Sequence, residues 1–127
     1  MKLTVFRSEK GDCLLLTSKN GKRMLIDGGM EKSYENHVAP ELGRLRDANK
    51  KVDLVYVSHI DRDHISGVLR MLDDEAAWRV HEFQVASGNP GHPIPQTPRP
   101  PKLGGIWHNA FRDQLGNLTE RVEDTLA

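Results

Sequence analysis

Two histidines and two aspartates stand within six consecutive residues near the middle of the chain: His59, Asp61, Asp63 and His64. The first three recur at every second position, so in an extended turn their side chains point the same way, while His64 approaches from another angle. Converging imidazole nitrogens and carboxylate oxygens are the ligands that a divalent metal ion requires. A polar turn in which Asp63 merely caps the next helix needs one acidic residue and no histidine. The spacing therefore predicts a metal site at residues 59–64, called the motif below.

The segments on either side of the motif would hold it in place. Residues 52–57 are apolar and rich in valine, which predicts a strand. A strand that ends in a polar turn delivers its last side chains to a crevice at the sheet edge. After the motif, apolar residues recur at helical spacing; they are Ile65, Val68, Leu69, Leu72 and Ala76. We expect a strand, a turn and a helix, with Asp63 able to cap that helix and bind metal as well.

The motif resembles the second motif of the metallo-β-lactamase fold superfamily, His-x-His-x-Asp-His, with Asp61 where the second histidine usually stands. The variant His-x-Asp-x-Asp-His, followed by Ile65-Ser66-Gly67, looks like that of the ComEC/Rec2-like, or competence-protein, branch. Upstream, a strand-like run that ends in Asp27-Gly28-Gly29 is similar to the superfamily's first motif. The two motifs stand in the expected order, and the resemblance extends to about residue 80.

This resemblance implies an α/β fold, the metallo-β-lactamase-like four-layer αββα sandwich, of which the chain would supply mainly the N-terminal sheet-and-helix half. It also implies a metal-dependent hydrolase, in which one or two divalent ions, zinc or manganese, activate a water molecule. The branch favours phosphodiester substrates, and hence nucleic acid, over thioesters or lactams. His59 and Asp61 would hold the first ion, while Asp63 and His64 would hold the second. Asp63, the expected catalytic residue, would also orient the water.

The first motif would act through the second. In the superfamily the residue matching Asp27 accepts hydrogen bonds that brace the metal-binding turn, and it orients the ligands without being one. Gly28 and Gly29 allow backbone conformations that are closed to other residues. The alternative is an ordinary Asp-Gly turn. The presence of the second motif favours the supporting role.

By the same resemblance, a complete site also needs a third histidine, a bridging carboxylate and a last histidine, all from later in the chain. The histidines after the motif are His81, His92 and His108, and His108 is the leading candidate ligand. Asp113 and Asp124 are the later carboxylates, with no motif around them. We therefore expect the rest of the site to come from a missing C-terminal half or from a partner chain. The alternative function is a non-catalytic scaffold or partner-binding module that retains the fold, and metal content distinguishes the two.

Composition limits the partners. The 127 residues carry 18 basic and 18 acidic side chains, so no field of the whole chain favours nucleic acid or a membrane. The N-terminal residues lack the apolar core of a signal peptide, and no apolar run reaches transmembrane length. We therefore expect a cytoplasmic protein that does not bind membranes. The single cysteine, Cys13, cannot form an internal disulfide, and it stands in an apolar run that predicts burial.

Three strands are expected before the first motif, at residues 3–6, 13–17 and 23–26, and the Asn20-Gly21 dipeptide predicts a hairpin between the last two. Between the motifs, a helix should begin near Pro40 and end near Asn49, because the proline clashes with a helix that starts earlier.

The later part of the chain divides at its prolines. Residues 80–85 predict one more strand, with a structural His81. Six of the seven prolines fall in residues 90–101, which predicts an extended loop or linker. From Phe111 onward, apolar spacing predicts an amphipathic helix. The expected organisation is the N-terminal half-domain at 1–89, the loop or linker at 90–105 and the helical segment at 106–127.

Overall fold

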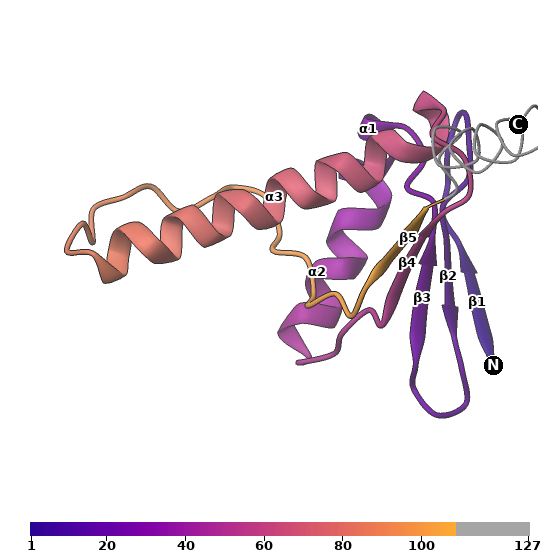
Figure 1. Ribbon diagram of the computed structural model, residues 1–127, viewed down its shortest axis with the longest axis horizontal. Helices are drawn as coiled ribbons and strands as arrows, with labels where there is room; N and C mark the ends of the chain where they lie inside the picture. Colours follow the sequence, from indigo (N-terminus) through magenta and orange to yellow (C-terminus); the bar gives the residue numbers. More distant parts are fainter. Residues whose placement is uncertain (109–127) are drawn as a thin grey trace, which may run out of the picture.

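The computed structural model describes residues 1–108 of the chain, and these residues form one five-stranded sheet with helices on one side (Figure 1). The strands lie side by side in chain order. They are β1 (Lys2–Val5), β2 (Leu14–Thr17), β3 (Arg23–Ile26), β4 (Leu54–Val57) and β5 (Ile106–His108). Strands β1 to β3 pair in antiparallel fashion, whereas β3, β4 and β5 run parallel. The expected α/β class is confirmed.

The predicted hairpin joins β2 to β3. Its turn runs from Ser18 to Lys22, closed by a backbone hydrogen bond of 2.8 Å between them. Gly21 takes a φ of 77°, a left-handed conformation that suits glycine. The strand expected at residues 52–57 is also present, although its regular part begins at Leu54 and Val52 makes an isolated bridge to Leu103.

The helical segment between β3 and β4 starts earlier than predicted. It runs through α1 (Glu31–Ser33), the π-helical η1 (Tyr34–Val38) and α2 (Ala39–Asp47) without leaving helical backbone. The α-helix expected to begin near Pro40 is present as α2, but the expectation that helical backbone would not precede the proline was wrong. That expectation assumed that the ring of Pro40 would clash with the preceding turn of helix. Directly before the proline, Ala39 donates its N–H to Tyr34, five residues back, and this wider π-turn removes the clash.

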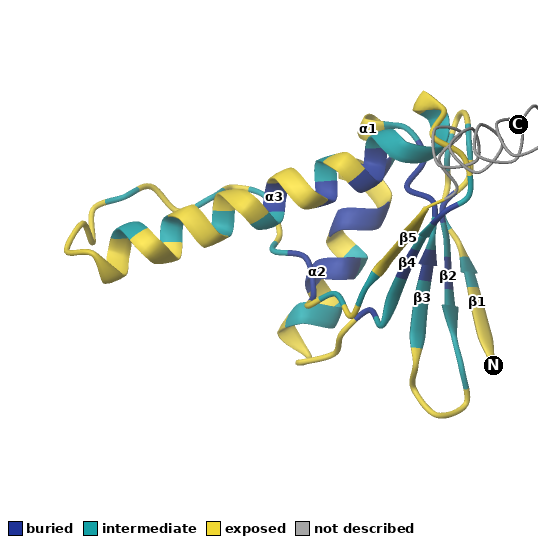
Figure 2. Ribbon diagram, in the orientation of Figure 1, coloured by how far each residue is buried: buried dark blue, intermediate teal, exposed yellow. Residues whose placement is uncertain are grey.

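The strand predicted at residues 80–85 is also wrong, because α3 (Arg62–Ala86) is one uninterrupted helix of 25 residues. Its second half extends beyond the sheet, and most of its side chains are exposed there (Figures 1 and 2). Val80 and Phe83 are 52 % and 67 % exposed, so these apolar side chains do not form a buried face. Extending an existing helix adds a hydrogen bond for each residue without a new nucleus, and that favours helix over a lone strand.

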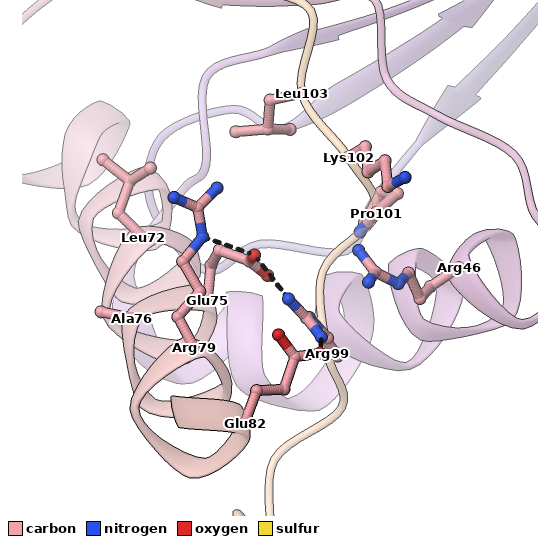
Figure 3. Close-up of a pocket in the computed structure, with 10 residues that line it drawn as sticks. All are labelled: Arg46, Leu72, Glu75, Ala76, Arg79, Glu82, Arg99, Pro101, Lys102 and Leu103. Carbon is pink, nitrogen blue, oxygen red and sulfur yellow. Dashed lines mark hydrogen bonds and ion pairs between the residues drawn. The ribbon is translucent and has the colours of Figure 1, made fainter. Parts of the chain in front are cut away.

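The proline-rich segment forms no helix or strand, and it returns along α3 toward the sheet (Figure 1). Trp78 of α3 donates from its indole nitrogen to the carbonyl of Thr97 at 2.9 Å. Arg99 lies between Glu75 and Glu82 of the same helix and forms ion pairs with both (Figure 3). The adjacent Pro100 and Pro101 are fully buried. The segment is therefore packed onto the domain at this point.

The hydrophobic core lies between the sheet and the helices. Leu15, Leu25 and Val55 stand in register on neighbouring strands and are at most 5 % exposed. They pack in one cluster with residues of the helical segments, such as Leu42 and Met71, and Cys13 is buried there as expected. Among residues 1–108, no element covers the opposite face, which is apolar; in register it carries Leu3, Val5, Leu14, Leu16, Met24, Ile26, Leu54, Tyr56 and Trp107. In the same range, no helix has both the length and the apolar character to cross a membrane.

Candidate functional site

The motif lies at the edge of the sheet where the three parallel strands end. Asp27 follows β3, and Ser58 and His59 follow β4. His108 is the last residue of β5 and pairs in register with Val57, directly before Ser58. Because parallel strands present their carboxyl ends at one edge, residues far apart in sequence are neighbours here.

Asp27 is the centre of this edge. It is 2 % exposed, and its φ of 59° is unusual for a residue other than glycine. One carboxylate oxygen accepts the backbone N–H of Ser58 at 2.7 Å, and the other accepts the Ser58 hydroxyl and meets Nδ1 of His64 at 3.0 Å. Its own N–H donates to the carbonyl of Tyr56 at 2.8 Å. These contacts hold a backbone conformation that would otherwise be costly.

The hydrogen bonds fix which nitrogen of each histidine carries the proton. A carboxylate only accepts, so His64 must donate to Asp27 from Nδ1. The single hydroxyl proton of Ser58 goes to Asp27, so Ser58 accepts from Nδ1 of His59, which lies 3.0 Å away. When neutral, both rings therefore present an Nε2 lone pair. This is the arrangement in which ligating histidines are normally held, with the other nitrogen bonded to a carboxylate or a neighbouring group.

The same contacts affect the charge of His64. Its partial burial acts to lower the pKa. The hydrogen bond that His64 donates to Asp27 and the negative charges of Asp27, Asp63 and Asp12 outweigh that effect, so the pKa of His64 is raised above its ordinary value. The edge of the sheet is thus an environment that favours positive charge.

Glycines let the two motifs touch. The N–H of Gly28 donates to the carbonyl of His64 at 2.8 Å, and the N–H of Gly67 donates to the carbonyl of Gly29 at 2.9 Å. A Cβ on Gly67 would stand 1.9 Å from the Gly28 oxygen, so neither Gly28 nor Gly67 leaves room for a side chain. Gly29 has the predicted special conformation, with a φ of 64°. Sequence reasoning missed the roles of Gly67 and Ser58, although both directly flank the chemically informative residues.

The predicted ligands are only partly brought together. The rings of His59 and His64 lie 5.1 Å apart between centroids, and a carboxylate oxygen of Asp63 is 3.8 Å from Nε2 of His64. Asp61 is exposed and occupies the N-cap position of α3, without a side-chain capping bond, so the prediction that Asp63 caps this helix was wrong. His108 is exposed at the end of β5. No three histidine, cysteine or acidic side chains within residues 1–108 are grouped closely enough to hold a metal ion.

The other later candidates lie elsewhere. The Nδ1 atoms of His81 and His92 are 3.1 Å apart, so these two rings contact each other. His81 follows His64 by 17 residues on α3, which places it about 25 Å along the helix. Neither residue can complete a site at the motif. Asp113, Asp124 and the predicted C-terminal helix lie outside the described residues.

These donors fit a divalent metal ion in kind, though not in number. Two imidazoles with available Nε2 lone pairs stand side by side, and Asp63 lies next to one of them. His59, His64 and Asp63 are the residues that would hold the ion, but in this arrangement they are not grouped closely enough to do so alone, so a closer approach and further ligands would be needed. Their roles as metal ligands stay a prediction, as does that of Asp61.

Comparison with known proteins bears on the same residues. A search of curated proteins found no match. The family model described as the metallo-beta-lactamase superfamily matches residues 9–121, which include both motifs and all strands after β1. The partial αβ architecture, a sheet with helices on one face, is consistent with part of that fold. The chain thus belongs to the metallo-beta-lactamase superfamily.

Proposed function

We propose that this protein is a metal-dependent hydrolase of phosphodiester bonds, of the ComEC/Rec2-like branch. Superfamily membership suggests the hydrolase and its divalent metal. The observation that supports it most directly is the contact of Asp27 with Ser58 and His64. A buried carboxylate that orients an imidazole is typical of the support of a metal-binding histidine, whereas an ordinary Asp-Gly turn does not require it. The His-x-Asp-x-Asp-His order favours phosphodiester chemistry by resemblance.

The residues would divide the work as follows. His59 and His64 would hold the metal, since their Nε2 lone pairs are the ones left available, and Asp63 would share in binding it and orient the attacking water. A bound divalent ion lowers the pKa of water and polarises the phosphoryl group. Asp61 in place of the usual histidine makes the site harder and shifts its preference from zinc toward manganese. We further propose that the missing ligands come from His108 and from residues outside the described range or from a partner chain.

Metal uptake and turnover test this proposal. The chain would be loaded with zinc or manganese, its metal content measured, and a chromogenic phosphodiester supplied. In whichever form turns the substrate over, this chain, a longer chain or the chain with its partner, Asp63→Asn should abolish turnover, whereas Asp73→Asn should not. The Asp73 side chain is exposed on the same helix, with no hydrogen bond or ion pair among the described residues. Equal activity in the two variants would refute the assignment of Asp63.

The non-catalytic scaffold stays the alternative, since no group of three ligands forms within residues 1–108. We expect weak or single-metal binding and little turnover by the 127-residue chain alone, because a partial ligand set leaves the metal without fixed geometry. Activity should then appear with a longer chain or with a partner. Absence of metal binding under all these conditions would favour the scaffold.

A further inference from the structure

We propose that a positively charged cleft beside the motif binds the phosphate groups of a single-stranded nucleic acid. The cleft has a volume of about 730 Å³ and lies among the loop after β1, the start of α1 and the first residue of α3. Four cationic side chains line it: Arg7, Lys10, Lys32 and Arg62. The inference rests on the proposed function, because it assigns a substrate class to that same site.

The cleft is continuous with the motif. Arg62 stands between Asp61 and Asp63 in the chain and lines the cleft. From the opposite side, the loop after β1 lies against the motif backbone, since a Cβ on Gly11 would come within 1.6 Å of the Asp63 carbonyl oxygen. A phosphodiester chain lying in the cleft would therefore run past the residues proposed to hold the metal.

The charges of the cleft are available to a ligand. None of its four cations takes part in an ion pair with another described residue, and all four are exposed. Two acidic residues also line the cleft, but Glu31 is paired with Arg70, which lies 3.1 Å away. The four cations outnumber the two acidic residues of the lining, Glu9 and Glu31. The cavity near the end of α2 is also cationic, and what distinguishes the cleft from it is that the cleft adjoins the motif.

Chemistry points to the backbone of a nucleic acid. The lining includes no phenylalanine, tyrosine or tryptophan, and His37 is its one ring on which a base could stack, so recognition would go mainly through phosphates and depend little on sequence. The cations come from three separate segments, which suits a chain of several phosphates better than a single one. The cationic surface along α3 differs, because Arg79 of that helix and Arg99 beside it are both paired with Glu75 (Figure 3).

A second basic group provides the control. Lys50, Lys51 and Lys102 surround a smaller cavity of about 300 Å³ near the end of α2, and Lys19 is exposed on the hairpin. The cleft variant carries Arg7→Gln, Lys10→Gln, Lys32→Gln and Arg62→Gln. The control variant carries Lys19→Gln, Lys50→Gln, Lys51→Gln and Lys102→Gln, which removes the same charge from the other surfaces. Both would be checked for folding by circular dichroism, with the paired variants Arg7→Gln/Lys10→Gln and Lys32→Gln/Arg62→Gln in reserve.

Binding of a fluorescein-labelled oligothymidylate is measured by anisotropy in EDTA, so that the result does not depend on metal or turnover. Four phosphate contacts on a single strand predict a slope of log affinity against log salt of about −2.8, and hence a loss of about 50-fold between 50 and 200 mM salt. The cleft variant should lose most of this affinity and slope, whereas the control should stay within about threefold of the parent chain.

Three results would overturn the inference: no binding by the parent chain, equal losses in the two variants, or displacement of the oligonucleotide by an equal phosphate concentration of thymidine monophosphate. The last would assign the cleft to a single phosphate group. Binding through the cleft without turnover by any loaded form would leave this inference standing and refute the proposed hydrolase. Turnover that the cleft variant retains in full would refute this inference and leave the proposed hydrolase standing.

Discussion

Gly67→Ala tests the contact that joins the two motifs. Gly67 lies three residues after His64 on α3, and its added Cβ would stand 1.9 Å from the oxygen and 2.5 Å from the carbon of the Gly28 carbonyl. Both are buried backbone atoms, which cannot rotate away as a side chain could. Two hydrogen bonds fix the approach, from Gly28 to His64 and from Gly67 to Gly29. To relieve the overlap, α3 must move away from the end of β3, and this movement would strain or break the two hydrogen bonds.

The magnitude follows from opposing effects. Within a helix, alanine in place of glycine ordinarily stabilises by about 1 kcal/mol. Overpacking a close contact costs about 1 to 3 kcal/mol, and each backbone hydrogen bond lost costs about 1 kcal/mol. The clash and the lost bonds outweigh propensity, so we expect the free energy of unfolding to fall by about 2 to 4 kcal/mol in Gly67→Ala.

Urea unfolding followed by circular dichroism measures this difference. The control is Gly105→Ala, because an added Cβ there meets nothing within 4 Å, and its stability should change by less than about 0.5 kcal/mol. Gly28→Ala should resemble Gly67→Ala, since the contact is mutual. A Gly67→Ala protein as stable as the parent, or more stable, would refute the geometry described for the joined motifs.

Further tests concern Asp27, Arg99 and Cys13. Asp27→Ala should weaken metal affinity about ten- to a hundredfold by calorimetry, and unchanged affinity would make Asp27 only a turn residue. Arg99→Gln should lower the free energy of unfolding at neutral pH by about 2 kcal/mol, and a change near zero would show that its ion pairs add nothing. Burial acts to raise the pKa of Glu75, but the hydrogen bonds from Arg99 and Arg79 outweigh it, so the pKa lies below its ordinary value of 4.5. The stabilisation of the fold by the Arg99–Glu75 pair should therefore be present above pH 4.5 and be lost as the pH falls through the lowered pKa. Burial, followed by the charge of Asp27, raises the pKa of Cys13 to about 12, so a thiol reagent should label it only as the protein unfolds; rapid labelling of the folded chain would contradict this.

Local patterns predicted those parts of the fold that local forces decide. The Asn20-Gly21 dipeptide favours a hairpin by its own conformational preference. The run at residues 52–57 is apolar enough to predict a strand, and its valines are buried in the core. The position of Asp27 beside the motif was expected from the resemblance of its segment to the superfamily's first motif, and its hydrogen bonds with Ser58 and His64 are present.

Context decided the rest. Residues 80–85 fit a strand by composition, yet they continue a helix that began at Arg62, and helix propagation prevailed over the local preference. Pro40 indicated a break, and the π-turn before it supplied a conformation that the proline rule does not include. The approach of Gly28 to Gly67 depends on how α3 docks at the sheet edge, and that is a property of two distant segments rather than of either sequence alone.

Asp27 connects the stability of the fold to the geometry of the site. A buried carboxylate is costly unless donors surround it, and here the donors are Ser58 and His64, all from the motif turn. The sheet can therefore bury Asp27 only when that turn is in place, so folding and site assembly are one process. Together with the bond between Ser58 and His59, these hydrogen bonds place the ring proton of His59 and of His64 on Nδ1. In both neutral rings the Nε2 lone pair is then left for a ligand. Further ligands would then meet two imidazoles whose orientation is already fixed, and a metal ion would bind without the cost of ordering them.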